Sequence, residues 1–85
     1  MTVMRQIEQF AYGVGEEVVF GLTQAEAFDL DRGAPITPAS MPAWTIGVIV
    51  ARKREGGVPS YLVRFEHHRV PCLTLAGQHQ IEGTA

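Results

Sequence analysis

The chain has 85 residues, a formal net charge of −2 at neutral pH, 46% hydrophobic residues and 19% charged residues. A chain of this length forms one domain, expected over residues 1–85, and it is too apolar to be disordered. Its longest apolar run, residues 46–51, is far shorter than the ~20 residues of a membrane-spanning helix, and its first residues lack the apolar core of a signal peptide.

The N-terminal third predicts a helix followed by a strand. Apolar residues between positions 2 and 11 recur at helical spacing, which predicts a short amphipathic helix at the N-terminus. Val18, Phe20 and Leu22 then share one face at a period of two, which predicts a strand. The glycines at positions 13 and 15 suit a tight turn with positive φ before that strand.

The middle of the chain combines a capping signal with a proline-containing loop. Thr23 and Glu26 match a capping box, so one or two helical turns are expected through Leu30. Residues 31–43 contain three prolines, which exclude a helix interior or a central strand and predict a long irregular loop. Loops of this length often bind partners.

Residues 44–75 predict an antiparallel meander. Trp44–Ala51 alternates apolar residues on both faces, so its first half is expected to be buried on both sides or to bend at Gly47. A glycine-containing hairpin loop at residues 55–59 and two further β-rich runs, at residues 61–66 and 70–75, follow. A last brief strand is expected over residues 79–82.

The order of these motifs resembles a known class of small domains. The segment Tyr12-Gly-Val-Gly-Glu-Glu-Val18, the pair Gly47-Val48 and the segment Tyr61-Leu-Val-Arg-Phe65 resemble the corresponding parts of SH3-like barrels. This class includes Tudor and KOW modules and the barrel of the nitrile hydratase β subunit. The resemblance covers roughly residues 12–82 and implies a mostly β fold, a small SH3-like barrel of about five antiparallel strands. Because this fold hosts many functions, it implies architecture alone.

The residues with ligand or nucleophile chemistry do not form a recognisable site. His67, His68, Cys72 and His79 have the spacing H-H-x3-C-x6-H, which lacks the paired ligands of most structural zinc sites. A cysteine on a strand of an 85-residue barrel has little room for an activating cation or helix start and for a substrate, which argues against Cys72 as a nucleophile with His67 or His79 as base. We therefore expect no metal, no cofactor and no enzymatic activity, and the single cysteine fits a reducing, cytoplasmic compartment.

Two binding functions remain. The first is a non-enzymatic protein-interaction module, or a small accessory subunit of a larger complex or enzyme. Its expected surface joins the proline loop to the basic hairpin and comprises Pro38, Met41, Trp44, Arg52, Lys53 and Arg54. The alternative is a KOW-type module that binds nucleic acid through the basic region at residues 52–69, with Arg52, Lys53, Arg54, Arg64 and Arg69 on the phosphates.

Two further possibilities concern the aromatic side chains and self-association. Four aromatic residues could form a cage for a methylated cation: Tyr12, Trp44, Tyr61 and Phe65. The alternating strand positions of Trp44, Tyr61 and Phe65 favour packing in the core instead. A homodimer formed through an open sheet edge is also compatible with the sequence.

Overall fold

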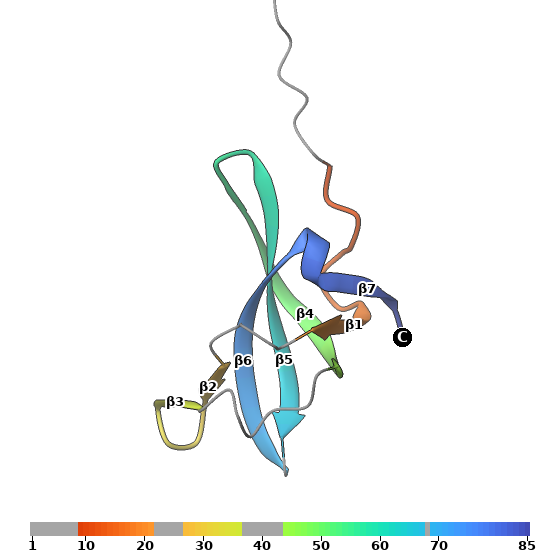
Figure 1. Cartoon of the computed structure of the whole chain (residues 1–85). Coiled ribbons are helices and arrows are strands. Elements are labelled where there is room, and N and C mark those ends of the chain that lie inside the picture. Colours follow the sequence, from red (N-terminus) through yellow and green to blue (C-terminus); the bar gives the residue numbers. More distant parts are fainter. Residues whose placement is uncertain (1–8, 22–26, 37–43, 68) are drawn as a thin grey trace, which may run out of the picture.

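A computed structural model of the chain describes residues 9–21, 27–36, 44–67 and 69–85 (Figure 1). Seven antiparallel strands form one sheet in the order β3-β2-β6-β5-β4-β1-β7. The strands are β1 (Glu17–Gly21), β2 (Ala27–Asp29), β3 (Ala34–Ile36), β4 (Trp44–Glu55), β5 (Val58–His67), β6 (Val70–Gly77) and β7 (Ile81–Thr84), and a 3-10 helix, η2 (Gln78–Gln80), joins the last two.

The centre of the sheet is the predicted meander of β4, β5 and β6. The β4–β5 hairpin turns at Gly56 and Gly57, whose φ angles of 57° and 85° suit a two-residue turn of the type that matches strand twist. This hairpin extends beyond the other strands (Figure 1). The meander and the strand at β1 are therefore confirmed, as is the positive φ of a glycine, Gly15, before β1.

A β-bulge divides β4 into two halves. Ile49 pairs with Val63 of β5, whereas the next paired residue, Ala51, lies opposite Leu62. Val50 is the extra residue, and side chains that follow it point to the opposite face from the one their spacing predicts.

The core lies on one face of the curled sheet. Ten apolar residues have at most 7% of their surface exposed: Val18, Phe20, Ala27, Ile49, Tyr61, Val63, Phe65, Cys72, Ala76 and Ile81. Phe20 and Phe65 pack edge to face, with ring centroids 5.6 Å apart. Tyr61 and Phe65 are thus core residues, as expected, whereas Trp44 is 55% exposed.

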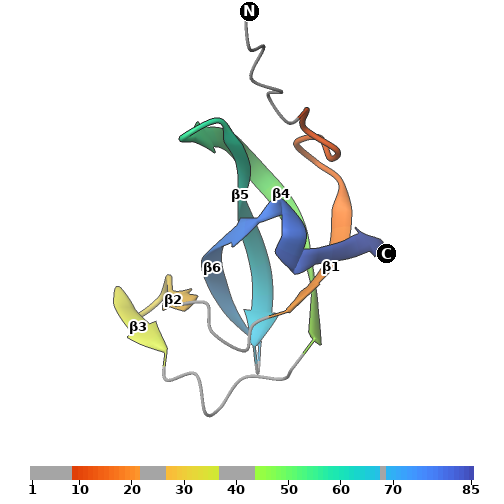
Figure 2. The same ribbon diagram turned by 45° about the horizontal axis from the view of Figure 1, so that its top comes forward.

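The prediction of a five-stranded barrel was wrong in strand number and closure. The sheet has seven strands, and its outermost strands, β3 and β7, lie on opposite sides of the molecule (Figures 1 and 2). The expected helix through Leu30 was wrong over Ala27–Asp29, which forms β2 because these residues pair with the edge of β6. Pairing across the sheet outweighs a local capping signal.

The loop predicted over residues 31–43 contains a strand. Pro35 lies at the centre of β3, an edge strand that pairs with β2, and this position tolerates a missing N–H. Residues 37–43, with Pro38 and Met41, lie outside the described residues. The predicted N-terminal helix falls mainly on residues 1–8, which also lie outside them, and Gln9–Ala11 is not helical.

Candidate functional site

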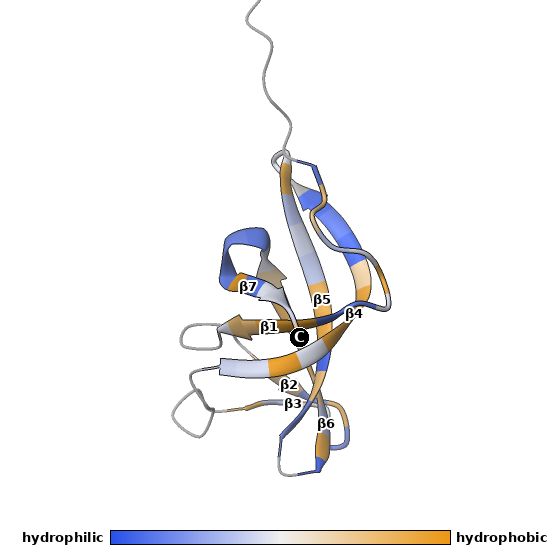
Figure 3. Cartoon of the chain, turned by 90° about the vertical axis from the view of Figure 1, so that its right-hand side faces the viewer, coloured by the Kyte–Doolittle hydropathy of each residue, from blue (hydrophilic) through white to orange (hydrophobic). Residues whose placement is uncertain are grey.

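The first half of β4 presents a row of apolar side chains on the face of the sheet that points away from the core. This outer β4 row consists of Trp44, Ile46, Val48 and Val50, which are 55%, 56%, 37% and 41% exposed. Figure 3 shows the hydrophobic segments of β4 on the side that faces the viewer. The expectation that this half of β4 is buried on both sides was therefore wrong, because only the face with Gly47 and Ile49 packs on the core.

Neighbouring strands extend this surface, which we call the outer face. Val48 pairs with Arg64 of β5 on one side and with Glu17 of β1 on the other. Arg64 in turn pairs with Leu73 of β6, and Leu73 with the 42%-exposed Phe28 of β2. Cross-strand partners share a face, so apolar side chains from several strands adjoin the outer β4 row.

Charged side chains flank the outer β4 row on both sides. Glu17, Arg64 and Glu66 line a shallow hollow of about 360 Å³ together with Ile46 and Val48. Arg64 and Glu66 are both exposed residues of β5, separated by the buried Phe65. The hollow therefore carries both signs of charge around an apolar centre.

The bulge places two of the predicted binding arginines on the opposite face. Arg52 pairs with the buried Tyr61, and the guanidinium carbons of Arg52 and Arg54 each lie 4.7 Å from the ring centroid of Phe10. Arg52 also donates a hydrogen bond to the carbonyl of Tyr12 at 3.4 Å. These exposed arginines hold the segment before β1 against the β4–β5 hairpin.

The structure separates the other predicted binding residues. Lys53 adjoins a hollow of about 280 Å³ with Leu62 and Leu75. Arg69 lies in the turn between β5 and β6, with a φ of 67°. The five cations of the nucleic-acid alternative are thus spread over two faces and the β5–β6 turn. Of the predicted protein-binding residues, Trp44 lies in the outer β4 row and Lys53 lies beyond the bulge on the same face, while Pro38 and Met41 lie outside the described residues.

The structure separates Cys72 from His79, two of the ligand-type residues considered above. Cys72 is buried near the start of β6, whereas His79 follows its far end in η2, seven residues away along a chain that advances about 3.3 Å per residue. Among the described residues, no three His, Cys, Asp or Glu side chains are grouped closely enough to hold a metal ion. His68 lies outside them.

Burial raises the pKa of the Cys72 thiol above its ordinary value of 9.0, and the nearby carboxylate of Asp29 raises it further. We expect iodoacetamide to alkylate Cys72 more slowly in the folded protein than in the unfolded chain, because burial shields the thiol and a raised pKa lowers its thiolate fraction. As pH rises above 9.0 the unfolded thiol ionises first, so the free energy of unfolding should fall. Cys72→Ala should remove this part of the slope, and equal alkylation rates in both states would contradict the prediction.

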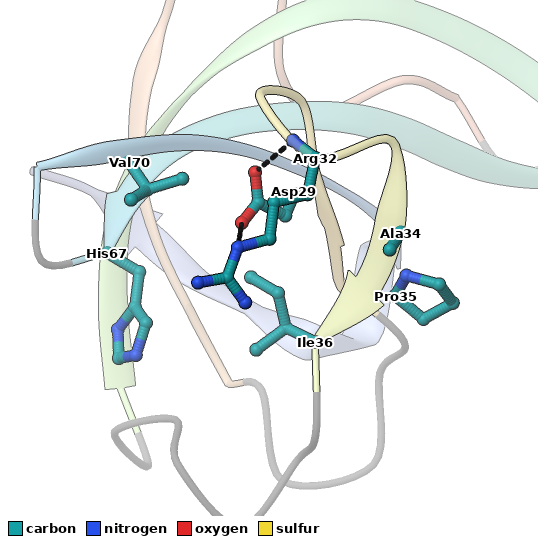
Figure 4. Close-up of a pocket in the computed structure, with 7 residues that line it drawn as sticks. All are labelled: Asp29, Arg32, Ala34, Pro35, Ile36, His67 and Val70. Atoms are coloured by element: carbon teal, nitrogen blue, oxygen red, sulfur yellow. Dashed lines mark hydrogen bonds and ion pairs between the residues drawn. The ribbon is translucent and has the colours of Figure 1, made fainter.

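A third hollow, of about 280 Å³, lies between the β2–β3 hairpin and the end of β5 (Figure 4). Its lining includes Asp29, Arg32, Ile36 and His67. One carboxylate oxygen of Asp29 accepts hydrogen bonds from the backbone N–H groups of Asp31 and Arg32 at 2.8 and 3.0 Å, and the other lies 3.8 Å from Nε of Arg32. Asp29 therefore fixes the turn between β2 and β3.

Comparisons with protein-family models, with curated proteins and with solved structures found no match to this chain. Across the described residues, no helix has the length and apolar character needed to cross a membrane. The fold and the chemistry of its surfaces are therefore the basis for assigning a function.

Sequence reasoning proposed Trp44 as a binding residue and did not include the rest of the outer β4 row. Its members Ile46, Val48 and Val50 were assigned to the scaffold because both faces of the strand are apolar in sequence. Glu17 and Glu66 were missed as well, since their position beside the row depends on strand register.

Proposed function

We propose that this chain is a non-enzymatic protein-interaction module, alone or as a small accessory subunit of a larger complex, that binds its partner through the outer face. The observation that supports this most is the outer β4 row, with its four alternating apolar side chains each more than a third exposed. Single exposed apolar residues are common on any protein, but a contiguous apolar patch with charged residues around it is typical of an interaction site.

The composition of the patch favours a protein partner. Trp44 lies at one end of the row, and exposed tryptophan is enriched among the residues that dominate the energy of protein interfaces. Arg64 lies beside Val48, and arginine is enriched at interfaces in the same way. An apolar centre with charged residues around it has the general anatomy of a protein–protein interface.

One part of the sheet supports a proposed relationship to SH3-like barrels. Five of the seven strands, β6-β5-β4-β1-β7, form a continuous antiparallel run with the number of strands that the resemblance implies. The β2–β3 hairpin adds two short strands to the β6 edge. We propose that the chain is an open, extended variant of such a barrel.

Binding of nucleic acid is supported less well by the positions of the cations. Arg52 and Arg54 lie over Phe10, while Arg64 lies on the outer face among apolar side chains. A nucleic-acid groove needs cations aligned along a backbone path with exposed aromatic rings beside them.

A photo-crosslinking residue tests the proposed function. Benzoylphenylalanine at position 46, in cells that make the protein, is expected to form a covalent adduct with a protein, because Ile46 is 56% exposed at the centre of the row. The matched control is the same replacement at Val58, an apolar residue that is 45% exposed at the tip of the β4–β5 hairpin, away from the outer β4 row. Absence of any adduct at position 46, or identical adducts at both positions, would contradict the proposal.

A further inference from the structure

The outer face is suited to one partner in particular. We propose that a second copy of this chain covers it, so that the outer β4 rows of two copies pack face to face in a two-fold dimer. This inference rests on the proposed function, because it names the partner of the same surface.

The apolar side chains of the row are complementary to themselves in size. In a face-to-face dimer the two-fold axis lies in the plane between the sheets, which pack about 10 Å apart. When the two β4 strands run in opposite directions, Trp44 of one copy lies over Val50 of the other, and Ile46 lies over Val48. Large side chains then oppose smaller ones, which is the arrangement that fills a core without strain.

The charges beside the row are complementary in the same arrangement. Arg64 lies next to Val48, and Glu66 lies two residues further along the same face of β5, beside Ile46. In the arrangement with oppositely directed β4 strands, Ile46 of one copy lies over Val48 of the other. Arg64 of each copy therefore lies opposite Glu66 of the other. In a second arrangement the two-fold axis runs along β4, so that the two β4 strands run in the same direction. Arg64 of each copy then lies opposite Glu17 of the other, because Glu17 and Arg64 pair with Val48 from opposite sides of β4.

Both two-fold arrangements thus pair the arginine with a carboxylate. Neither arrangement places two of these three charges of like sign directly opposite each other. A partner with a single sign of charge would instead leave either Arg64 or the two glutamates, Glu17 and Glu66, against a like charge, which costs free energy. The net charge of −2 adds little repulsion between copies.

The edges of the sheet are less suited to dimerisation than this face. The edge strand β3 has three residues with Pro35 at its centre, and the other edge strand, β7, has four residues. Short edge strands and edge prolines protect a sheet from pairing with another strand. The structure therefore favours the outer face over the open edge as the surface of a homodimer.

Sedimentation velocity of the full chain tests this proposal. We expect a mass twice the 9.3 kDa of one chain at high protein concentration and dissociation on dilution. Ile46→Ser should weaken the dimer by about 100-fold or more, because one apolar contact is lost from each copy. The control Val58→Ser, at the tip of the β4–β5 hairpin, should leave the dissociation constant unchanged.

Charge reversal tests the charge pairing independently. Arg64→Glu should weaken the dimer, and a second change should restore it. Restoration by Glu66→Arg would show that the two β4 strands run in opposite directions, whereas restoration by Glu17→Arg would show that they run in the same direction. Circular dichroism of each variant verifies that the fold is retained, as expected for exposed positions.

Two results would overturn the proposal. The first is a monomer at all concentrations up to about 1 mM, which detects even weak association. The second is a dimer whose dissociation constant is unchanged by both Ile46→Ser and Arg64→Glu. If the chain is monomeric while position 46 crosslinks to a different protein, the second copy is excluded and the proposed function stands.

Discussion

Replacement of Gly47 by alanine is expected to lower the free energy of unfolding by about 3 kcal/mol, at the upper end of the usual range for overpacking. A Cβ atom at this position would lie 2.6 Å from Cγ1 of Val63, 2.8 Å from the carbonyl oxygen of Arg64 and 2.9 Å from Cε1 of Phe20. The carbonyl belongs to the backbone of β5 and cannot rotate away, so β4 and β5 must separate locally. Urea denaturation monitored by tryptophan fluorescence measures the change.

Gly13→Ala is the matched control for this prediction. A Cβ at Gly13 would meet its nearest atom, Oε1 of Glu16, at an ordinary 3.6 Å, and φ at this position is not positive. We expect a change of less than about 1 kcal/mol, as for a glycine at an unstrained position. Equal destabilisation by both substitutions would show that the close approach of β4 to β5 at Gly47 is not the cause.

Tyr61→Ala should cost about 3–5 kcal/mol of stability, the usual range for removing a large aromatic side chain from a core. Tyr61 is fully buried, and its ring packs edge to face against Phe10 and Tyr12, with centroid distances of 5.9 and 5.7 Å. Its hydroxyl accepts hydrogen bonds from the backbone N–H groups of Ala11 and Tyr12 at 3.1 and 3.4 Å and donates one to Oε1 of Gln78. One side chain therefore joins β5, η2 and the segment before β1.

Tyr61→Phe separates the hydroxyl from the ring. It should cost about 1–3 kcal/mol, because it leaves hydrogen-bond partners unsatisfied while the ring contacts remain. Hydrogen exchange should accelerate at the amides of Ala11 and Tyr12 and remain slow in the central strands. An equal loss of stability for Tyr61→Phe and Tyr61→Ala would show that the ring contacts contribute little.

The parts of the fold that the sequence predicted are those set by local signals. Alternation at Val18 and Phe20 predicted β1, and paired glycines at positions 56 and 57 predicted the hairpin. Each of these signals lies within the segment that it describes, since side-chain alternation and turn conformation depend on nearby residues.

The predictions that were wrong concern features set by strands that are distant in the sequence. Ala27–Asp29 becomes a strand because the edge of β6 lies beside it, and a capping box carries no information about that edge. Which face of β4 is buried depends in the same way on β1 and β5, because both faces of the strand read as apolar. The candidate site depends on this choice of face, so the sequence led us to propose Trp44 but not its exposed neighbours Ile46, Val48 and Val50.

The extra residue at Val50 also gives β4 two separate environments along one strand. Before it, the even-numbered residues form the apolar outer row; after it, the even-numbered residues Arg52 and Arg54 contact Phe10 on the other side. Side chains alternate at a period of two, so the same residues paired regularly, without the bulge, would place the two arginines in line with the apolar row. The bulge thus separates an apolar surface from a cationic one along a single strand, and the pairing of β4 is as important to recognition as its residue types.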